Sequence, residues 1–159
     1  HPGGHMSAVV ITNLLNRYCE CVDLGDLVSA SLLFEHVKLK MITSAELRDH
    51  TAMLELLQRA IIIYPDGTPR TRHVLSNPII HIDEQRGTAT SRSYYTVFQA
   101  TEDIPLQVIA TGRYLDEFEY VDGRWRFSYR ESQATMFGNI SGHIRLTEEL
   151  SSKLFAANK

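Results

Sequence analysis

The sequence contains little that would bind nucleic acid or enter a membrane. Its formal net charge is −3 over 159 residues, too small for the basic surface that attracts nucleic acid or anionic lipid. No run of like charges forms a tail, and no segment is typical of a signal peptide or a membrane span. Hydrophobic residues make up 43% and charged residues 22%, which are ordinary values for a globular domain. We therefore expect a cytoplasmic protein without nucleic-acid or membrane partners.

Cysteine and the motifs of cofactor chemistry are also scarce. The two cysteines, Cys19 and Cys21, stand two apart in a predicted helix, where their side chains point in different directions. Two such thiols predict neither a disulfide nor a metal site. The chain has no GxGxxG, Walker or HExxH motif and no nucleophile elbow. We expect no metal and no cofactor.

The length favours a single domain, since the chain has no internal repeat and no linker. Residues 1–5, which read HPGGH, are typical of the remnant of an expression tag. We therefore expect one domain over residues 6–159.

Helical spacing dominates the first half of the chain and strand composition the second. The predicted early segments are helices at Ser7–Val22 and Asp26–Phe34, a strand at Val37–Ile42, and a helix from Ser44 that stops before Pro65. The predicted late segments are strands at Thr71–Asp83, Thr88–Thr101, Pro105–Val121 and Arg124–Met136, then a short helix at Thr147–Phe155. Helices followed by a strand meander predict an α+β domain whose antiparallel sheet carries helices on one face. Long strands must curl around those helices, and the space between them is a natural pocket.

Two polar side chains are candidates for chemistry. Asp23 stands at the C-terminal end of the first predicted helix, where the helix dipole disfavours a carboxylate by about 0.3–1 kcal/mol. Asp is equally an ordinary turn residue. His73 lies inside an apolar strand, either as an acid/base group or as a structural histidine paired with a neighbour. The remaining histidines are interpreted as exposed or structural: His36, His50, His81 and His143.

Several segments follow one another in a distinctive order and spacing, namely YCECVDLGD, TRHVLSNP, SRSYYTVFQA, GRYLDEFEYVDGRWRF and the late Arg130. In this order and spacing they resemble SnoaL-like proteins of the NTF2-like superfamily. The family includes scytalone dehydratase, bile-acid 7α-dehydratase, hexachlorocyclohexane dehydrochlorinase and polyketide cyclases. The resemblance implies an NTF2-like cone, with three N-terminal helices packed on a curved antiparallel sheet around a central cavity. It also implies a homodimer.

The resemblance also implies roles for residues. Its dehydratase members pair an Asp at the end of the first helix with a His on the strand after the third helix, and Asp23 and His73 match those positions. His73 would be the base and Asp23 would orient it. Tyr18 would polarise a substrate oxygen, or be a helix core residue. The bile-acid enzyme has a further acidic residue where Val97 stands here, so Tyr18, Tyr95 or His73 itself would have to donate the proton.

The expected pocket takes a small hydrophobic ligand. Its predicted apolar lining is Leu14, Phe34, Leu57, Tyr95, Val97 and Phe98. Arg130 would bind an anionic substrate group, or form an ion pair with Asp116, Glu117 or Glu119 on the sheet exterior. We predict a cofactor-free lyase or isomerase, dehydratase- or cyclase-like, with a small cyclic substrate. The alternatives are a non-catalytic small-molecule-binding protein and a structural β-type subunit of a ring-hydroxylating dioxygenase.

Overall fold

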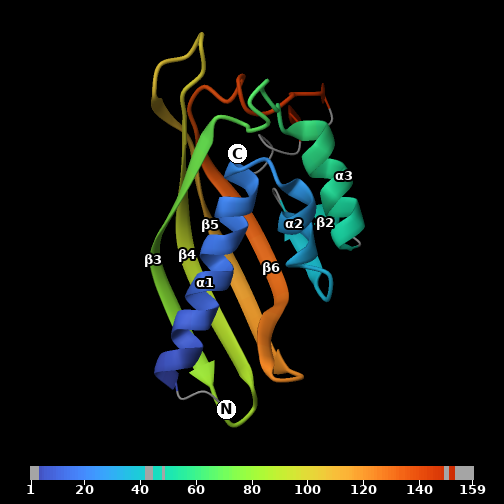
Figure 1. The fold of residues 1–159 in the computed structure, drawn as a ribbon, viewed down its shortest axis with the longest axis vertical. Coiled ribbons are helices and arrows are strands. Elements are labelled where there is room, and N and C mark those ends of the chain that lie inside the picture. The colour runs from blue at the N-terminus through green and yellow to red at the C-terminus, as the bar shows by residue number, and fades with distance from the viewer. Residues whose placement is uncertain (1–3, 42–44, 48, 149–150, 153–159) are drawn as a thin grey trace.

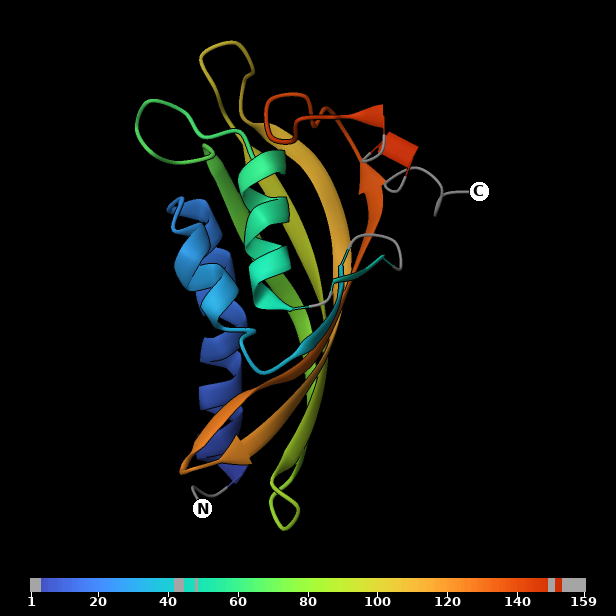
Figure 2. The same ribbon diagram turned by 90° about the vertical axis from the view of Figure 1, so that its right-hand side faces the viewer.

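Helices lie along one side of a curved sheet in the computed structural model, which describes residues 4–41, 45–47, 49–148 and 151–152 (Figures 1 and 2). The elements are α1 (Gly4–Asp23), α2 (Leu27–Leu32), β1 (Lys38–Met41), β2 (Ala45–Leu47), α3 (His50–Ala60), β3 (Thr71–Asp83), β4 (Thr88–Gln99), β5 (Gln107–Val121) and β6 (Arg124–Phe137). The predicted α+β arrangement is confirmed. None of the helices in the described ranges has the length and apolarity that crossing a membrane requires.

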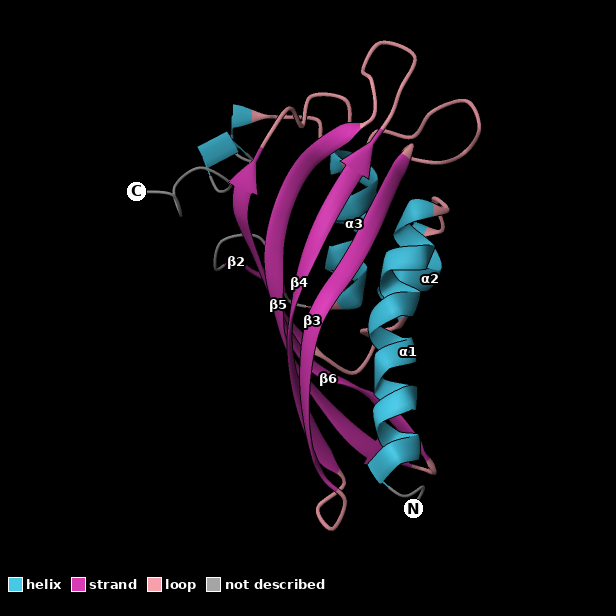
Figure 3. Ribbon diagram, turned by 90° about the vertical axis from the view of Figure 1, so that its left-hand side faces the viewer, coloured by secondary structure: helices cyan, strands magenta, loops and turns pink. Residues whose placement is uncertain are grey.

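The long strands β3 to β6 form the predicted antiparallel meander within a sheet of order β2-β1-β6-β5-β4-β3. Asp122 and Gly123 close the last hairpin, both with positive φ, as their sequence predicts. Register shifts interrupt all three pairings of these strands, and such irregularities bend a strand. The curvature is visible in Figure 3, where the strands bend past the helices. At the other edge β1 runs parallel to β6, a pairing that residue alternation cannot reveal.

The first two helices follow the sequence signals closely. Ile11, Leu15, Tyr18 and Val22 recur at helical spacing on α1, and all four are buried. Gly25, with φ +78°, ends this helical segment. Asp26 then caps α2, because its carboxylate accepts a hydrogen bond from the Ser29 amide. The chain therefore turns back sharply just beyond Asp23, which leaves that carboxylate facing β3.

The third helix begins later than the sequence predicts. Residues Ala45–Leu47 form the edge strand β2, and α3 starts only at His50. Asp49 is the N-cap, since its side chain accepts a hydrogen bond from the Ala52 amide at 2.9 Å. Ser44, the predicted start, lies outside the described residues, as does much of the predicted helix at Thr147–Phe155.

The segment after β6, residues 138–145, returns across the end of α3. The Ile62 amide donates to the His143 carbonyl at 2.9 Å, and the Arg145 amide donates to the Ala60 carbonyl at 2.7 Å. Two side chains fix the neighbouring Gly142, whose carbonyl accepts from Gln99 Nε2 at 2.9 Å and from the Tyr64 hydroxyl at 2.5 Å. This segment closes the wide end of the curved sheet.

Candidate active site

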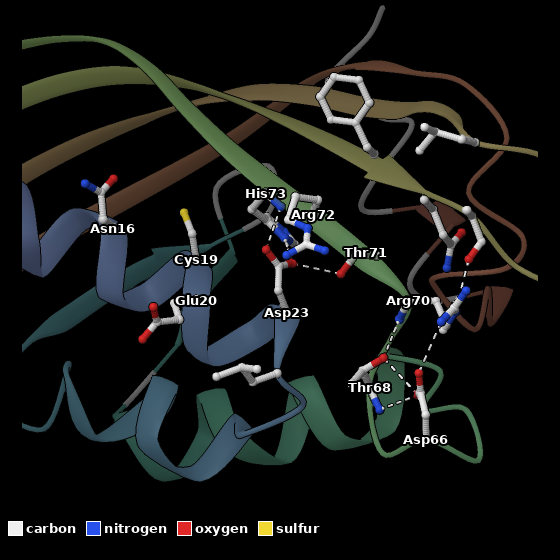
Figure 4. A pocket seen from close by; sticks show the side chains of 15 residues that line it. Asn16, Cys19, Glu20, Asp23, Asp66, Thr68, Arg70, Thr71, Arg72 and His73 are labelled. Carbon is white, nitrogen blue, oxygen red and sulfur yellow. Dashed lines mark hydrogen bonds and ion pairs between the residues drawn. The ribbon is translucent and has the colours of Figure 1, made fainter.

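Asp23 and His73 are in direct contact at the junction of α1 and β3. His73 Nδ1 lies 2.6 Å from Asp23 Oδ1, and the His73 backbone amide donates to Asp23 Oδ2 at 2.7 Å. The Thr71 hydroxyl adds a hydrogen bond of 2.9 Å to Oδ1 (Figure 4). The carboxylate therefore accepts hydrogen bonds from two residues of the same strand, and these fix its position relative to the imidazole.

These contacts decide the protonation of the pair. Partial burial alone would raise the pKa of Asp23, but hydrogen bonds and charge attraction from His73, with help from Thr71, lower it below its ordinary value. Asp23 is thus ionised at neutral pH. A carboxylate facing Nδ1 favours the proton on that nitrogen, which leaves the Nε2 lone pair of His73 free to accept a proton.

His73 lines an inner cavity of about 130 Å³ between the helices and the sheet. Of the residues predicted to line the pocket, Leu57, Tyr95 and Val97 line this cavity, and so does Tyr18, which was predicted to polarise a substrate oxygen. An apolar cavity of about 150 Å³ is large enough to hold one benzene ring. The space therefore matches a molecule with a single ring.

An outer groove of about 690 Å³ lies on the other side of the pair. Its lining is mostly polar and includes Asn16, Glu20, Arg70 and Arg72, which Figure 4 shows around Asp23 and His73. Phe98, predicted for the apolar lining, faces this groove and not the cavity. Because His73 lines both spaces, its imidazole stands between the groove and the inner cavity.

Three of the predicted binding residues lie elsewhere. Leu14 lines a separate hollow near the end of α2, and Phe34 is fully buried against Phe127. Arg130 is fully buried as well and contributes to neither the cavity nor the groove. For Arg130, on β6, alternation along the strand does not say which set of side chains faces the helices.

Arg130 forms an ion pair with Asp116, as one of the two predictions had it. The pair lies in the interior, however, whereas the prediction placed it on the sheet exterior. Its Nε and Nη2 donate to the two Asp116 oxygens at 2.7 and 3.0 Å, and both side chains are 0% exposed. The guanidinium carbon lies 3.8 Å from the centre of the Tyr114 ring. Burial alone would lower the pKa of Arg130, yet the Asp116 charge raises it above its ordinary value. Arg130 is therefore a permanent cation behind the aromatic wall of the cavity.

The tyrosines of this wall are suited to donate hydrogen bonds. Burial raises the pKa of Tyr95 to about 12, and burial also raises the pKa values of Tyr18 and Tyr114, although the Arg130 charge opposes the rise. All three hydroxyls keep their protons at neutral pH. They can polarise a substrate oxygen but cannot act as bases.

His143 is a polar cavity residue that the sequence interpretation treated as structural, and Ser132 is another that it did not name. The His143 ring lies 6.2 Å from the His73 ring, centre to centre, and both rings line the cavity. Burial, reinforced by the His73 charge, lowers the pKa of His143 to about 3. A lone histidine after the last predicted strand carried no periodic signal. The one available hint is its place beside the apolar Ile140 and Ile144, which line the same cavity.

The described residues contain no cluster of three or more His, Cys, Asp or Glu side chains that could hold a metal ion. Both cysteines are free, and Cys19 lines the outer groove. Burial raises the pKa of the Cys19 thiol to about 11, so it is not a thiolate at neutral pH.

Comparison with known proteins identifies relatives of this arrangement. The family model described as a SnoaL-like domain matches residues 8–131. The solved structure of Rv3472, a protein of unknown function from Mycobacterium tuberculosis, is 22% identical with a TM-score of 0.69, covering 96% of this chain and 89% of that one. A candidate scytalone dehydratase from Novosphingobium aromaticivorans is 23% identical with a TM-score of 0.66, covering 85% and 88%.

A third solved structure represents a different class of protein. The β subunit of a candidate aromatic-ring-hydroxylating dioxygenase from Novosphingobium aromaticivorans is 16% identical with a TM-score of 0.67, covering 89% of this chain and 98% of that one. No curated protein sequence matches this chain. Likeness at such low identity establishes the shared fold, and one fold hosts many activities.

Proposed function

The chain belongs to the SnoaL-like family, and from that premise we propose that it is a cofactor-free lyase or isomerase acting on a small cyclic substrate. The observation that carries the proposal is the 2.6 Å contact between His73 Nδ1 and Asp23 Oδ1 at the wall of a ring-sized cavity. An acid–histidine pair of this geometry fixes the imidazole tautomer and stabilises the imidazolium that forms when it takes a proton.

The proposed reaction begins with proton transfer to His73. Its Nε2 takes a proton from the carbon beside a substrate carbonyl, and the C–H electron pair moves into an enolate. In a dehydratase the enolate then expels a β-hydroxyl group, which takes the proton from the His73 imidazolium and leaves as water. In an isomerase the same proton returns to another carbon. Asp23 stays ionised throughout, so it holds His73 in place during both steps.

The cavity restricts the substrate. Pockets for drug-sized ligands measure roughly 300–1,000 Å³, whereas this cavity measures about 130 Å³. The residues that line it include no Lys, Arg, Asp or Glu. An uncharged ketone with one ring fits both conditions, and a charged substituent would have to extend toward the polar outer groove.

The tyrosines supply the hydrogen-bond donors that an acidic residue would otherwise provide. Val97, only 3% exposed, stands where the bile-acid dehydratase has its further acidic group. Tyr18 and Tyr95 line the same cavity and remain protonated, as the raised pKa of each hydroxyl requires. They can hydrogen-bond the departing or the carbonyl oxygen.

The test is turnover of a panel of monocyclic β-hydroxy ketones, followed by the appearance of the conjugated enone. We expect wild type to dehydrate at least one member and His73→Ala to be inactive. His81→Ala is the matched control, since His81 is an exposed histidine on the same strand. Equal rates for wild type and His73→Ala would refute the proposal.

A second candidate is a small-molecule-binding protein without catalysis. Val97 favours it, because an apolar side chain occupies the place of a third polar catalytic group. This alternative predicts that affinity for a ring-sized ligand survives His73→Gln and that the ligand is recovered unchanged. Recovery of an altered ligand excludes it.

A third candidate is a structural subunit, favoured by the shared fold of the dioxygenase β subunit. Such a subunit would require an iron-bearing partner chain. We instead expect the isolated chain to form a homodimer. Size-exclusion chromatography with light scattering separates these cases, since a stable homodimer of the chain alone argues against an obligate hetero-complex.

A further inference from the structure

The inner cavity has a second imidazole, and it comes from a segment 70 residues further along the chain. His73 is on β3, whereas His143 is in the segment 138–145 that follows β6. The ring centres are 6.2 Å apart and the ring planes meet at 70°. Both rings line the same 130 Å³ space, so they can contact neighbouring atoms of one ring-sized molecule.

The backbone around His143 is held rigidly. Its amide donates to the Ile140 carbonyl at 3.0 Å, and its carbonyl accepts from the Ile62 amide at 2.9 Å. The preceding carbonyl, that of Gly142, accepts from Gln99 Nε2 and from the Tyr64 hydroxyl. A side chain on so well-fixed a backbone is positioned before any substrate arrives, which is what makes a hydrogen-bond donor effective in catalysis.

The imidazole of His143 is buried without being fully satisfied. The residue is 7% exposed, and Nδ1 has no hydrogen-bond partner among the described residues. Leaving a buried polar atom unpaired costs about 1–3 kcal/mol, so an unpaired atom of a residue that lines a cavity calls for an explanation. Buried polar side chains with a purely structural role are usually paired with a neighbour.

We propose that His143 is a further catalytic residue, which hydrogen-bonds the substrate carbonyl oxygen and stabilises the negative charge that develops there when His73 removes the proton. This inference rests on the proposed function, and it names the substrate as a monocyclic ketone. The lowered pKa keeps His143 uncharged at neutral pH, and an uncharged imidazole can polarise a carbonyl group. An imidazolium beside protonated His73 would repel it, so the uncharged form also suits the proton transfer.

The kinetic test compares His143→Phe with His143→Gln on the ketone panel. Phe keeps a ring but has no nitrogen, and Gln keeps a hydrogen-bond donor. Removal of one donor of this kind lowers kcat by about 10²- to 10³-fold, and we expect that loss in His143→Phe with little change in KM. We expect His143→Gln to recover part of it and the control His81→Phe to behave as wild type. Full kcat in His143→Phe overturns the inference.

A binding test keeps the inference separate from the proposed function. Phenol has one ring and one oxygen, and it needs no turnover. We expect phenol to shift the ring ¹⁵N resonances of His143 in the wild-type protein, measured by NMR with ¹⁵N-labelled histidine. If no ketone is turned over, the proposed reaction fails, yet a His143 shift on phenol binding still supports the oxygen contact. Phenol that does not bind, or that leaves these resonances unmoved, overturns it even if His143→Phe fails to fold.

Discussion

Two arginine–carboxylate pairs on the β5–β6 hairpin allow a controlled measurement of how burial changes the contribution of an ion pair to stability. Arg130 lies opposite Asp116 and Arg126 lies opposite Glu119, each with an Nε–oxygen distance of 2.7 Å. The first pair is 0% exposed, whereas the second has side-chain exposures of 31% and 34%. The perturbations are Arg130→Met and Asp116→Asn, with Arg126→Met and Glu119→Gln as matched controls.

The expected losses in the free energy of unfolding differ severalfold between the two pairs. In the buried pair, removal of one residue leaves its partner charged and cut off from water, whereas in the exposed pair water solvates the remaining charge. Removing one partner of a buried pair costs about 3–5 kcal/mol, whereas an exposed pair contributes about 0.2–1 kcal/mol. Arg130→Met should lose more than Asp116→Asn, because it also removes the contact with the Tyr114 ring, 3.8 Å from the guanidinium. Against a total stability of roughly 5–15 kcal/mol, a loss of about 3–5 kcal/mol is large enough to measure in either buried variant.

The assay is urea unfolding followed by the fluorescence of Trp125, the single tryptophan, which is 4% exposed. The double variant Arg130→Met/Asp116→Asn should lose less unfolding free energy than the sum of the two single losses, since it leaves no unpaired charge. Burial raises the pKa of Asp116 even beside Arg130. With the guanidinium gone, the loss in Arg130→Met should therefore shrink as pH falls and the carboxylate protonates. Equal losses for the two pairs, or strictly additive losses in the double variant, would refute this reasoning.

Three further predictions concern the cavity. The pKa of His143 falls from 6.5 to about 3 on folding, so between these values the unfolded chain binds a proton that the folded chain does not. The free energy of unfolding should therefore fall by up to about 1.4 kcal/mol for each pH unit below 6.5. In urea unfolding at several pH values, His143→Phe should reduce this dependence on pH, and an unchanged dependence contradicts the assignment. Asp23→Asn should leave the thermal midpoint nearly intact but lower turnover of the ketone panel by about 10⁴-fold through the wrong His73 tautomer, and near-normal turnover would argue against its orienting role. Gly112→Ala should cost about 1–3 kcal/mol in thermal unfolding, because the added Cβ would lie 2.3 Å from both the Gln133 carbonyl and the Tyr95 ring, and an unchanged midpoint would show that this strand can move.

Local signals in the sequence predicted the elements where one residue decides the boundary. Gly25 and Asp26 marked the turn after α1, and Asp122-Gly123 marked the last hairpin. The predicted start of α3 was wrong, because Asp49 is the N-cap of this helix and the three-residue edge strand β2 precedes Asp49. The SnoaL-like resemblance is confirmed, and it paired Asp23 with His73 across 50 residues where spacing alone left both open.

The sequence could not predict two kinds of residue. The first are residues whose role depends on which face of the sheet they point to, and the second are residues in segments without hydrophobic periodicity. Arg130 and Asp116 are opposite each other in the β5–β6 register, but only the curvature of the sheet decides that they point inward. His143 owes its place to backbone hydrogen bonds between the last segment and the end of α3. Such bonds form between groups that every residue carries, so they leave no mark in the amino-acid pattern.

The proton-transfer pair and part of the lining of the inner cavity come from different segments of the chain. Asp23 belongs to the first helix, while Ile140, His143 and Ile144 come from the stretch after the last long strand. Insertions or substitutions in residues 138–145 could therefore change which ligands fit the inner cavity while the proton-transfer pair stays intact. A protein built in this way can change its substrate by altering one short segment.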